Sequence, residues 1–264
     1  MSLFMLNLPP FQVMSRLFAD IVIPVAVSGS FTYAVPEEMR GSVRRGSLVT
    51  VPFGQSRSAA GMVVKVHDTA PEDFTVRDIN SLLPGEPALS ERLTDFLMWI
   101  SEYYMAYPGE VMKAAIPSPE DLPGRPVKRR RKETPVAETP VTVAPAELNR
   151  VQGEAHDAIR RLFAEHDTVL LHGVTSSGKT EIYIHLMREY LGQGRQVLYM
   201  LPEIALTTQI IERLRKHFGG DIGVFHSRLT PAARREVWKK VSDGSLRAVL
   251  GVRSSLFLPF SDLG

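Results

Sequence analysis

The chain has 264 residues, of which 44% are hydrophobic and 23% are charged, a balance typical of one or two globular domains. It contains no cysteine, which excludes disulfide bonds, thiolate metal sites and cysteine nucleophiles within it. No apolar run approaches the roughly eighteen residues of a transmembrane helix, so we expect no membrane partner.

The formal net charge of +2 is unevenly distributed along the chain. Residues 1–117 contain 9 basic and 12 acidic residues, a net charge of −3, whereas residues 148–264 contain 16 basic and 12 acidic residues, a net charge of +4. A protein that coats nucleic acid usually shows a clear basic excess. If the first region binds nucleic acid, we therefore expect a small binding site there.

The first fifteen residues are apolar but do not fit a signal peptide, because they lack a basic start and contain Pro9 and Pro10. We expect residues 1–15 to be a leader or tag, with Met14 as the natural start.

Residues 16–117 are expected to form a small β-rich domain. Short runs of β-branched and aromatic residues, separated by turn residues, predict strands over 21–27, 31–35, 47–52 and 59–66. A helix is predicted from its N-cap Ser90 to about Tyr104, because apolar residues recur there at spacings of three and four.

Residues 118–146 contain six prolines and few bulky apolar residues, which predicts an extended linker. The linker includes the basic run Lys128–Lys132. Such a run could contact a phosphate backbone or could simply be a solvated part of the linker, and the sequence leaves both interpretations open.

From residue 147 to 264, predicted helices and strands alternate. The helices are predicted over 154–165, 180–191, 206–218 and 231–241, and the strands over 168–172, 196–200, 222–225 and 246–251. This alternation favours βαβ units and a parallel sheet, so the fold class is α/β. His172 ends the first of these strands, and we expect it to be a buried core histidine.

A phosphate-binding loop follows that first strand. The segment GVTSSGKT matches the pattern G-x-x-x-x-G-K-[ST], and its members are Gly173, Val174, Thr175, Ser176, Ser177, Gly178, Lys179 and Thr180. Glycine lets backbone N–H groups approach a phosphate closely, and the following helix directs its positive N-terminal end at the anion. Lys179 would reach the β- and γ-phosphates, and the Thr180 hydroxyl would bind Mg²⁺. The sequence therefore predicts an ATP and Mg²⁺ site with Lys179 and Thr180 as its catalytic residues.

Three more segments follow the later strands, at 201–209, 226–227 and 251–257. The carboxyl ends of parallel strands form the functional edge of such a sheet, so we expect these segments to lie there. Their hydroxyl groups and amide N–H groups could hold a phosphodiester backbone.

The motifs GVTSSGKTExY, LPEIALTxQ, HS and GxRSSxF, in this order and spacing, resemble the first motor lobe of the PriA family of replication-restart helicases (primosomal protein N′). Residues 22–25, 31–33, 51–54 and 103–104 are similar to the DNA-binding domain of the same family. The resemblance implies an incomplete RecA-like P-loop lobe preceded by a small β-rich domain that binds the 3′ end of DNA.

The resemblance also implies site residues. In the motor region it implies adenine recognition by Gln152, a nucleotide-site role for Glu181, and DNA contacts by Arg253 and Ser254. In the first region it implies a pocket for a DNA 3′ end, formed by Phe31, Thr32, Gly54 and Arg77. Thr32 stands where relatives often carry an acid, and Phe31 could equally be an ordinary core aromatic.

Two departures from the family pattern bear on function. The family carries a winged-helix domain between the two regions, and it continues beyond this chain into a D-E-x-H motif, a zinc module and a second motor lobe. We therefore expect a fragment or an engineered deletion that turns over little ATP alone, with zinc only in the missing part.

The resemblance implies the N-terminal portion of an ATP-dependent 3′→5′ DNA helicase in the bacterial cytoplasm, which recognises stalled or D-loop forks and restarts replication by primosome assembly. Its partners would be forked and single-stranded DNA, single-stranded DNA-binding protein and helicase-loading proteins. Two alternatives stay open: a non-catalytic DNA-end binding module with a nucleotide site, and a P-loop phosphotransferase, which would need an acceptor-binding lid.

Overall fold

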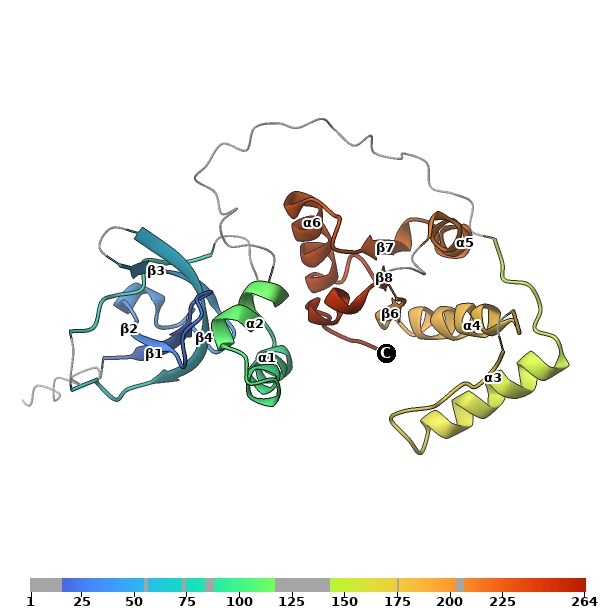
Figure 1. The fold of residues 1–264 in the computed structure, drawn as a ribbon, viewed down its shortest axis with the longest axis horizontal. Coiled ribbons are helices and arrows are strands. Elements are labelled where there is room, and N and C mark those ends of the chain that lie inside the picture. The colour runs from blue at the N-terminus through green and yellow to red at the C-terminus, as the bar shows by residue number, and fades with distance from the viewer. Residues whose placement is uncertain are drawn as a thin grey trace, which may run out of the picture. The chain divides into compact units, whose positions relative to one another are not determined.

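The computed structural model describes residues 16–54, 57–72, 75–83, 88–116, 143–174, 176–202 and 207–264. Contacts divide the chain into two compact units, Met1–Met112 and Lys113–Gly264 (Figure 1). The expected leader 1–15 and most of the expected linker lie outside the described residues. The domain bounds from the sequence stay a prediction.

Unit 1 contains a five-stranded antiparallel sheet in the order β2-β1-β4-β3-β5. Its strands are β1 (Phe18–Val22), β2 (Phe31–Ala34), β3 (Leu48–Phe53), β4 (Arg57–His67) and β5 (Ser81–Leu82), with a 3₁₀ turn η1 (Glu37–Met39). One core cluster of this unit includes Ile21, Tyr33, Val49, Val51 and Val63. Consecutive residues are buried in β1 and in β4, including Met62 beside Val63, so both faces of these strands are covered and a period-two alternation is not kept.

The first strand ends earlier than predicted, at Val22 instead of residue 27. Pro24 cannot donate a ladder hydrogen bond, so the chain leaves the sheet there. The N–H groups of Val25 and Val27 instead donate to the carbonyls two residues earlier.

Two helices follow the strands of unit 1, and the second continues three residues past the unit's last residue, Met112. Helix α1 (Glu91–Tyr103) is capped by Ser90, whose hydroxyl accepts from the Leu93 N–H at 3.2 Å, as the sequence predicts. Helix α2 (Pro108–Ala115) lies against the segment after β1. Gly109 permits this close approach, since a Cβ there would collide with the carbonyl oxygens of Ile23 and Val25.

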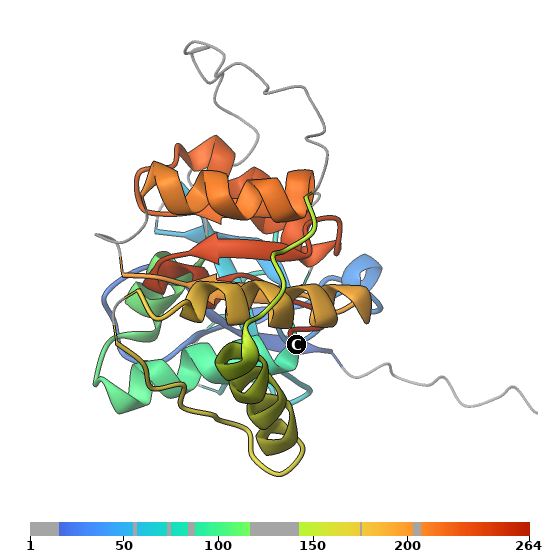
Figure 2. The same ribbon diagram turned by 90° about the vertical axis from the view of Figure 1, so that its right-hand side faces the viewer.

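Unit 2 contains a three-stranded parallel sheet in the order β6-β8-β7. The strands are β6 (Val197–Met200), β7 (Ile222–Phe225) and β8 (Ala248–Gly251), and the helices are α3 (Arg150–Phe163), α4 (Lys179–Gly192), α5 (Thr208–Phe218) and α6 (Pro231–Ser242). Two short 3₁₀ turns are η4 (Gly219–Asp221) and η5 (Arg253–Phe257). Residues of α4 and α5 share one hydrophobic cluster with the strands, and α6 lies on the other side of the sheet (Figures 1 and 2).

The α/β class is therefore confirmed, with a β-rich antiparallel unit followed by a parallel-sheet unit. Among the described helices, none combines the length and the apolarity that crossing a bilayer requires.

The predicted strand over 168–172 is wrong. This segment forms no ladder with any strand of the described residues, and the side chain of Leu170 is 89% exposed. A strand needs a neighbour to satisfy its backbone N–H and C=O groups, and apolar β-branched sequence does not supply one. His172 is exposed in consequence, so the expectation of a buried core histidine is also wrong.

Helix α3 begins four residues earlier than predicted, at Arg150. Asn149 forms a capping box there: its side chain accepts from the Gln152 N–H at 3.0 Å, and the Gln152 side chain accepts from the Asn149 N–H at 3.0 Å.

Candidate nucleotide and DNA-end sites

The phosphate-loop segment leads directly into α4. Gly178 is the N-cap of the helix and has φ +85°, in the left-handed region that glycine adopts without steric cost. Ser176 also has a positive φ of 63°, which is uncommon for a residue with a side chain. The loop thus turns sharply and places the first N–H groups of α4 at its centre, the arrangement that binds anions. Thr175 lies outside the described residues.

Lys179 is held by the loop itself. Its ammonium donates to the carbonyl oxygens of Gly173 at 2.6 Å and Val174 at 2.7 Å. The same side chain packs under Gly173, where an added Cβ would lie 3.4 Å from the Lys179 Cδ. An ammonium group has three N–H donors, so one remains for a phosphate oxygen while these two bonds persist, and a second phosphate contact requires the release of a loop carbonyl.

Gln152 reaches the loop from α3. Its amide nitrogen donates to the Gly178 carbonyl at 3.4 Å, and a Cβ at Gly178 would collide with that nitrogen. Its amide oxygen is engaged in the capping box with Asn149. The structure therefore brings Gln152 to the loop, as the sequence predicts, although both ends of its amide already have partners.

Residues from β6 and α5 surround the first turn of α4. The Thr180 side chain shares a hydrogen bond with the phenol of Tyr199 on β6. Glu181 forms an ion pair with Arg213 of α5, and the side chain of Glu181 is only 20% exposed. Burial raises the pKa of Tyr199, the nearby Tyr183 phenol adds to this effect, and the bond with Thr180 opposes it.

Sequence reasoning missed Tyr199 and Arg213 as neighbours of the loop. Tyr199 precedes the motif at 201–209 by two residues in a predicted strand, which is a weak signal, and Arg213 gives none. Both come from elements that only the fold brings to α4.

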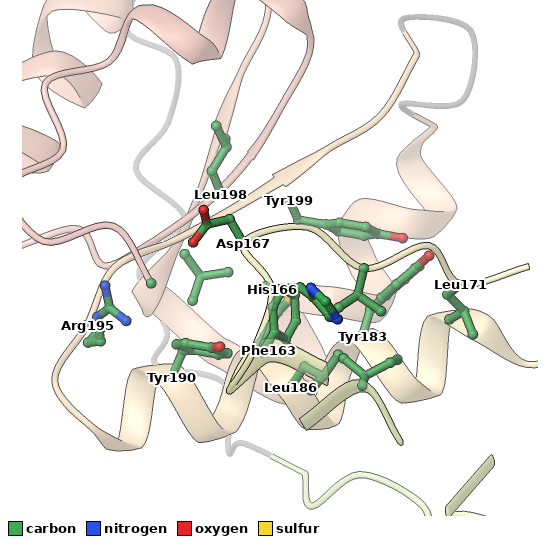
Figure 3. Close-up of a pocket in the computed structure, with 15 residues that line it drawn as sticks. Phe163, His166, Asp167, Leu171, Tyr183, Leu186, Tyr190, Arg195, Leu198 and Tyr199 are labelled. Atoms are coloured by element: carbon green, nitrogen blue, oxygen red, sulfur yellow. The ribbon is translucent and has the colours of Figure 1, made fainter. Parts of the chain in front are cut away.

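A cavity of about 500 Å³ lies beside the loop region in unit 2 (Figure 3). The side chains of Tyr183, Leu186 and Tyr190 from α4 line it, together with Leu198 and Tyr199 of β6 and the segment that contains Leu171. The cavity thus lies between the edge of β6 and the unpaired segment before the phosphate loop. Its lining combines apolar side chains with three ionisable ones, His166, Asp167 and Arg195, and none of the residues that line it belongs to the phosphate loop at 173–180.

The three later motif segments follow β6, β7 and β8 directly, at one edge of the parallel sheet, as expected. Residues 203–206 lie outside the described residues. In η5, Arg253 is exposed, whereas the Ser254 hydroxyl is buried without a hydrogen-bond partner in the described part of the chain. A DNA contact by either residue stays a prediction.

In unit 1, three of the four predicted pocket residues lie together. Phe31 on β2 packs edge-to-face against Phe53 on β3, with ring centres 5.6 Å apart. Gly54 follows Phe53 with φ +71° and open space where a Cβ would lie. The Arg77 guanidinium donates to the Gly54 carbonyl at 3.0 Å.

We call Phe31, Gly54 and Arg77 the Phe31 group. The side chain of Tyr33 supports it from the neighbouring part of β2. The phenol of Tyr33 donates to the Pro52 carbonyl at 3.0 Å, which ties β2 to β3. Burial raises the pKa of Tyr33, and the positive charge of Arg77 opposes that shift. The phenol therefore stays neutral at physiological pH.

Thr32 alternates with Phe31 along β2, so its side chain leaves the opposite side of the strand. Its hydroxyl donates to the carboxylate of Asp20 on β1 at 2.7 Å, and the same carboxylate lies 3.3 Å from His67 Nε2. The structure does not join Thr32 to the Phe31 group through side chains. The sequence did not indicate Asp20 as a partner of Thr32, because this pairing depends on the β1–β2 register.

Two family models match the chain. Residues 20–117 match the 3′DNA-binding domain of PriA, and residues 149–261 match the DEAD/DEAH box helicase. The two matches fall on the two sequence regions that carry the predicted DNA-end pocket and the phosphate loop.

Individual relatives agree with the two family matches. The chain is 35% identical to the replication restart protein PriA of Rickettsia felis over 246 residues, which cover 93% of the chain and 36% of that protein. The corresponding values for Rickettsia conorii are the same. For Chlamydia pneumoniae the identity is 26% over 322 residues, which cover 94% of the chain and 43% of that protein. The chain thus spans less than half the length of these relatives.

The alignment lengths bear on the region between the two units. For the Rickettsia proteins, the 246 aligned positions equal the number of residues that this chain contributes, since 93% of 264 is about 246. The alignment therefore leaves no room for an additional domain in those relatives. The longer Chlamydia alignment does leave room for one. The alignment with the Rickettsia proteins thus runs across both regions with a connection of similar length.

Proposed function

We propose that this chain, which belongs to the PriA family of replication restart proteins, binds ATP or ADP with Mg²⁺ in unit 2 and the 3′ end of a DNA strand in unit 1. The observation that carries the nucleotide part is the loop at 173–180, with Gly178 in the left-handed conformation at the start of α4. The DNA part rests on the Phe31, Gly54 and Arg77 group.

The nucleotide would lie along the N-terminus of α4. The backbone N–H groups of the loop and the Lys179 ammonium would hold its phosphates, and Thr180 would hold Mg²⁺. Bound Mg²⁺ supplies charge neutralisation on the phosphate oxygens. Tyr199 and the Glu181–Arg213 pair keep the first turn of α4 in position.

The DNA end would lie at the Phe31 group. The exposed part of the Phe31 ring can stack on a terminal base, which contributes about 1–3 kcal/mol per base. Gly54 allows the strand end to approach the backbone, and Arg77 can contact one phosphate. Because this region has a net charge of −3, we propose a short contact at the end of a strand and not a long phosphate track.

For a protein of the relatives' length, we propose ATP-dependent 3′→5′ unwinding at stalled or D-loop forks in the bacterial cytoplasm, and loading of the replicative helicase with single-stranded DNA-binding protein as a partner. For this chain, which spans 36% of the Rickettsia relatives, we propose a second and narrower role as a DNA-end binding module with a nucleotide site. We expect it to turn over little ATP alone.

The test is fluorescence anisotropy of the chain with matched oligonucleotides that end in a 3′-hydroxyl or a 3′-phosphate. A 3′-phosphate adds up to about two negative charges at the position where the hydroxyl would be held. We expect the 3′-hydroxyl strand to bind about tenfold more tightly, a difference of about 1.4 kcal/mol. Equal affinity for the two strands would refute the end pocket.

A further inference from the structure

Helix α1 and the segment that follows it expose several aromatic rings that neither proposed site uses. We define the α1 aromatic cluster as Phe96, Trp99, Tyr103, Tyr104 and Tyr107. Four of its members are well exposed: Trp99 by 50%, Tyr103 by 64%, Tyr104 by 68% and Tyr107 by 45%. Soluble proteins expose single apolar side chains commonly, whereas contiguous apolar patches usually mark an interaction surface.

Four of the five rings form a chain of contacts. Phe96 stacks on Trp99 with ring centres 6.2 Å apart and planes at 12°, and Trp99 stacks on Tyr103 at 4.8 Å and 27°. Tyr104 meets Tyr103 edge-to-face at 4.9 Å. The spacing 96, 99 and 103 places the three stacked rings on one face of α1, while Thr94, Leu97 and Ser101 form its buried face.

The backbone under the cluster is fixed. Met105, just after the helix, has a positive φ of 50°, which is uncommon for a non-glycine residue. Two hydrogen bonds hold this turn, from the Ser101 hydroxyl to the Ala106 carbonyl at 2.6 Å and from the Ala106 N–H to the Ser101 carbonyl at 3.0 Å. The rings at the end of α1 are therefore presented on a rigid support, which lowers the entropy lost when a partner binds.

Three sources of negative potential coincide at this end of α1. The C-terminal end of a helix carries a partial negative charge, and the last turn of α1 contains no basic residue. Glu102 lies between the rings of Trp99 and Tyr103 in the sequence, and Glu110 is in the first turn of α2. The faces of aromatic rings are themselves electronegative and attract Lys and Arg side chains. The basic residues of the two helices, Arg92 and Lys113, lie at the opposite helix ends, in the first turn of α1 and the last turn of α2.

We propose that the α1 aromatic cluster is a docking surface for a basic peptide segment of a partner protein. Lys or Arg side chains of the segment lie over Trp99 and Tyr103, and one of them pairs with Glu102. The charge of the surface matches a cationic peptide and opposes a phosphate backbone. The surface is separate from the Phe31 group, so this inference does not depend on the DNA-end pocket.

Intrinsic fluorescence gives a direct readout of binding. The chain has two tryptophans, Trp99 in the cluster and Trp238, which is 1% exposed. The probe is a synthetic peptide of Lys-Ala-Arg-Ala repeats, with a Glu-Ala-Glu-Ala peptide and single-stranded oligo(dT) as comparison ligands. Each titration is repeated on a chain with residues 128–132 changed to serine, because that basic run would compete for the same surface.

We expect a saturable change in Trp99 emission with the basic peptide, which weakens with salt, and no change with the acidic peptide. Tyr103→Ala should weaken binding by about 2- to 30-fold, the range expected for one cation–π contact. Glu102→Gln should weaken it less and reduce its dependence on salt. Leu256→Ala, at an exposed apolar residue of unit 2, is the matched control and should leave binding unchanged.

Circular dichroism of each variant establishes that the exposed substitutions leave the fold intact. The proposal is overturned if the basic peptide causes no saturable change in Trp99 emission. It is also overturned if the acidic peptide binds equally, or if oligo(dT) binds the cluster more tightly than the basic peptide, since the surface would then be a base-stacking platform.

Discussion

Unit 1 and unit 2 support their candidate sites in different ways. In unit 1 the Phe31 group is carried by β2 and by residues next to β3. Strand β3 is paired on both sides, and the edge strand β2 is paired with β1 and linked to β3 by the Tyr33 hydrogen bond. The core of this unit includes fully buried Ile21, Val49 and Val63. In unit 2 the phosphate loop follows the segment 168–172, which has no ladder partner in the described residues and an exposed Leu170. The comparison teaches that a binding motif can be locally complete while the backbone that leads to it is poorly anchored.

The largest expected difference between the two units is in amide hydrogen exchange. The amides of 168–172 should exchange at least about a thousandfold faster than those of β4, because unpaired backbone opens at almost no cost in free energy. Exchange detected by mass spectrometry measures this, and added ADP and Mg²⁺ should slow exchange in the loop that follows. Protection of 168–172 equal to that of β8 would abolish the contrast.

The next largest effect is on nucleotide affinity in unit 2. Lys179→Ala removes a charge-assisted contact to phosphate worth about 1.5–3 kcal/mol, so ADP affinity should fall roughly ten- to hundredfold. Calorimetric titration with Mg²⁺ present measures the change. Lys240→Ala, which only breaks an exposed ion pair with Glu236, is the control and should leave ADP affinity unchanged. If both variants bind ADP like the parent chain, the loop is not a nucleotide site.

In unit 1 we expect a comparable or smaller loss of affinity for a DNA strand end. Phe31→Ala should weaken binding of a 3′-hydroxyl strand by about five- to hundredfold, the loss of one base stack, and should leave ADP affinity in unit 2 unchanged. Anisotropy titration checks this, with Phe163→Ala on α3 as a control at another partly exposed aromatic residue. Undiminished binding by Phe31→Ala would support the reading of Phe31 as an ordinary core aromatic.

The smallest effect is expected at Thr32. Its hydroxyl is engaged by Asp20, so Thr32→Val should change the affinity for a 3′ end by less than about twofold. The lost hydrogen bond should lower the free energy of unfolding by about 0.5–1.5 kcal/mol, measured by urea denaturation. A loss of DNA binding as large as that of Phe31→Ala would mean that both sides of β2 contact the strand end.

The features that could be predicted from sequence are those that depend on near neighbours in the chain. The phosphate loop, the N-cap Ser90 and the helices of unit 2 all follow from residues within a few positions of one another. The strand over 168–172 could not be judged in this way, because a strand exists only if another backbone lies beside it. The same limit applies to Asp20, Tyr199 and Arg213, which reach their sites from other elements.

The capping box at Asn149 has a consequence for base selectivity. The amide oxygen of Gln152 accepts from the Asn149 N–H at the start of α3, and its amide nitrogen donates to the Gly178 carbonyl. Each end of that amide keeps one unused site, a second N–H and a second oxygen lone pair, so a purine held by Gln152 would have to use these with both partners in place. The amide would then meet the base in the orientation that the capping box sets. Loss of the Asn149 cap would let the amide turn, so a less firmly capped helix would hold its base-contacting side chain less precisely.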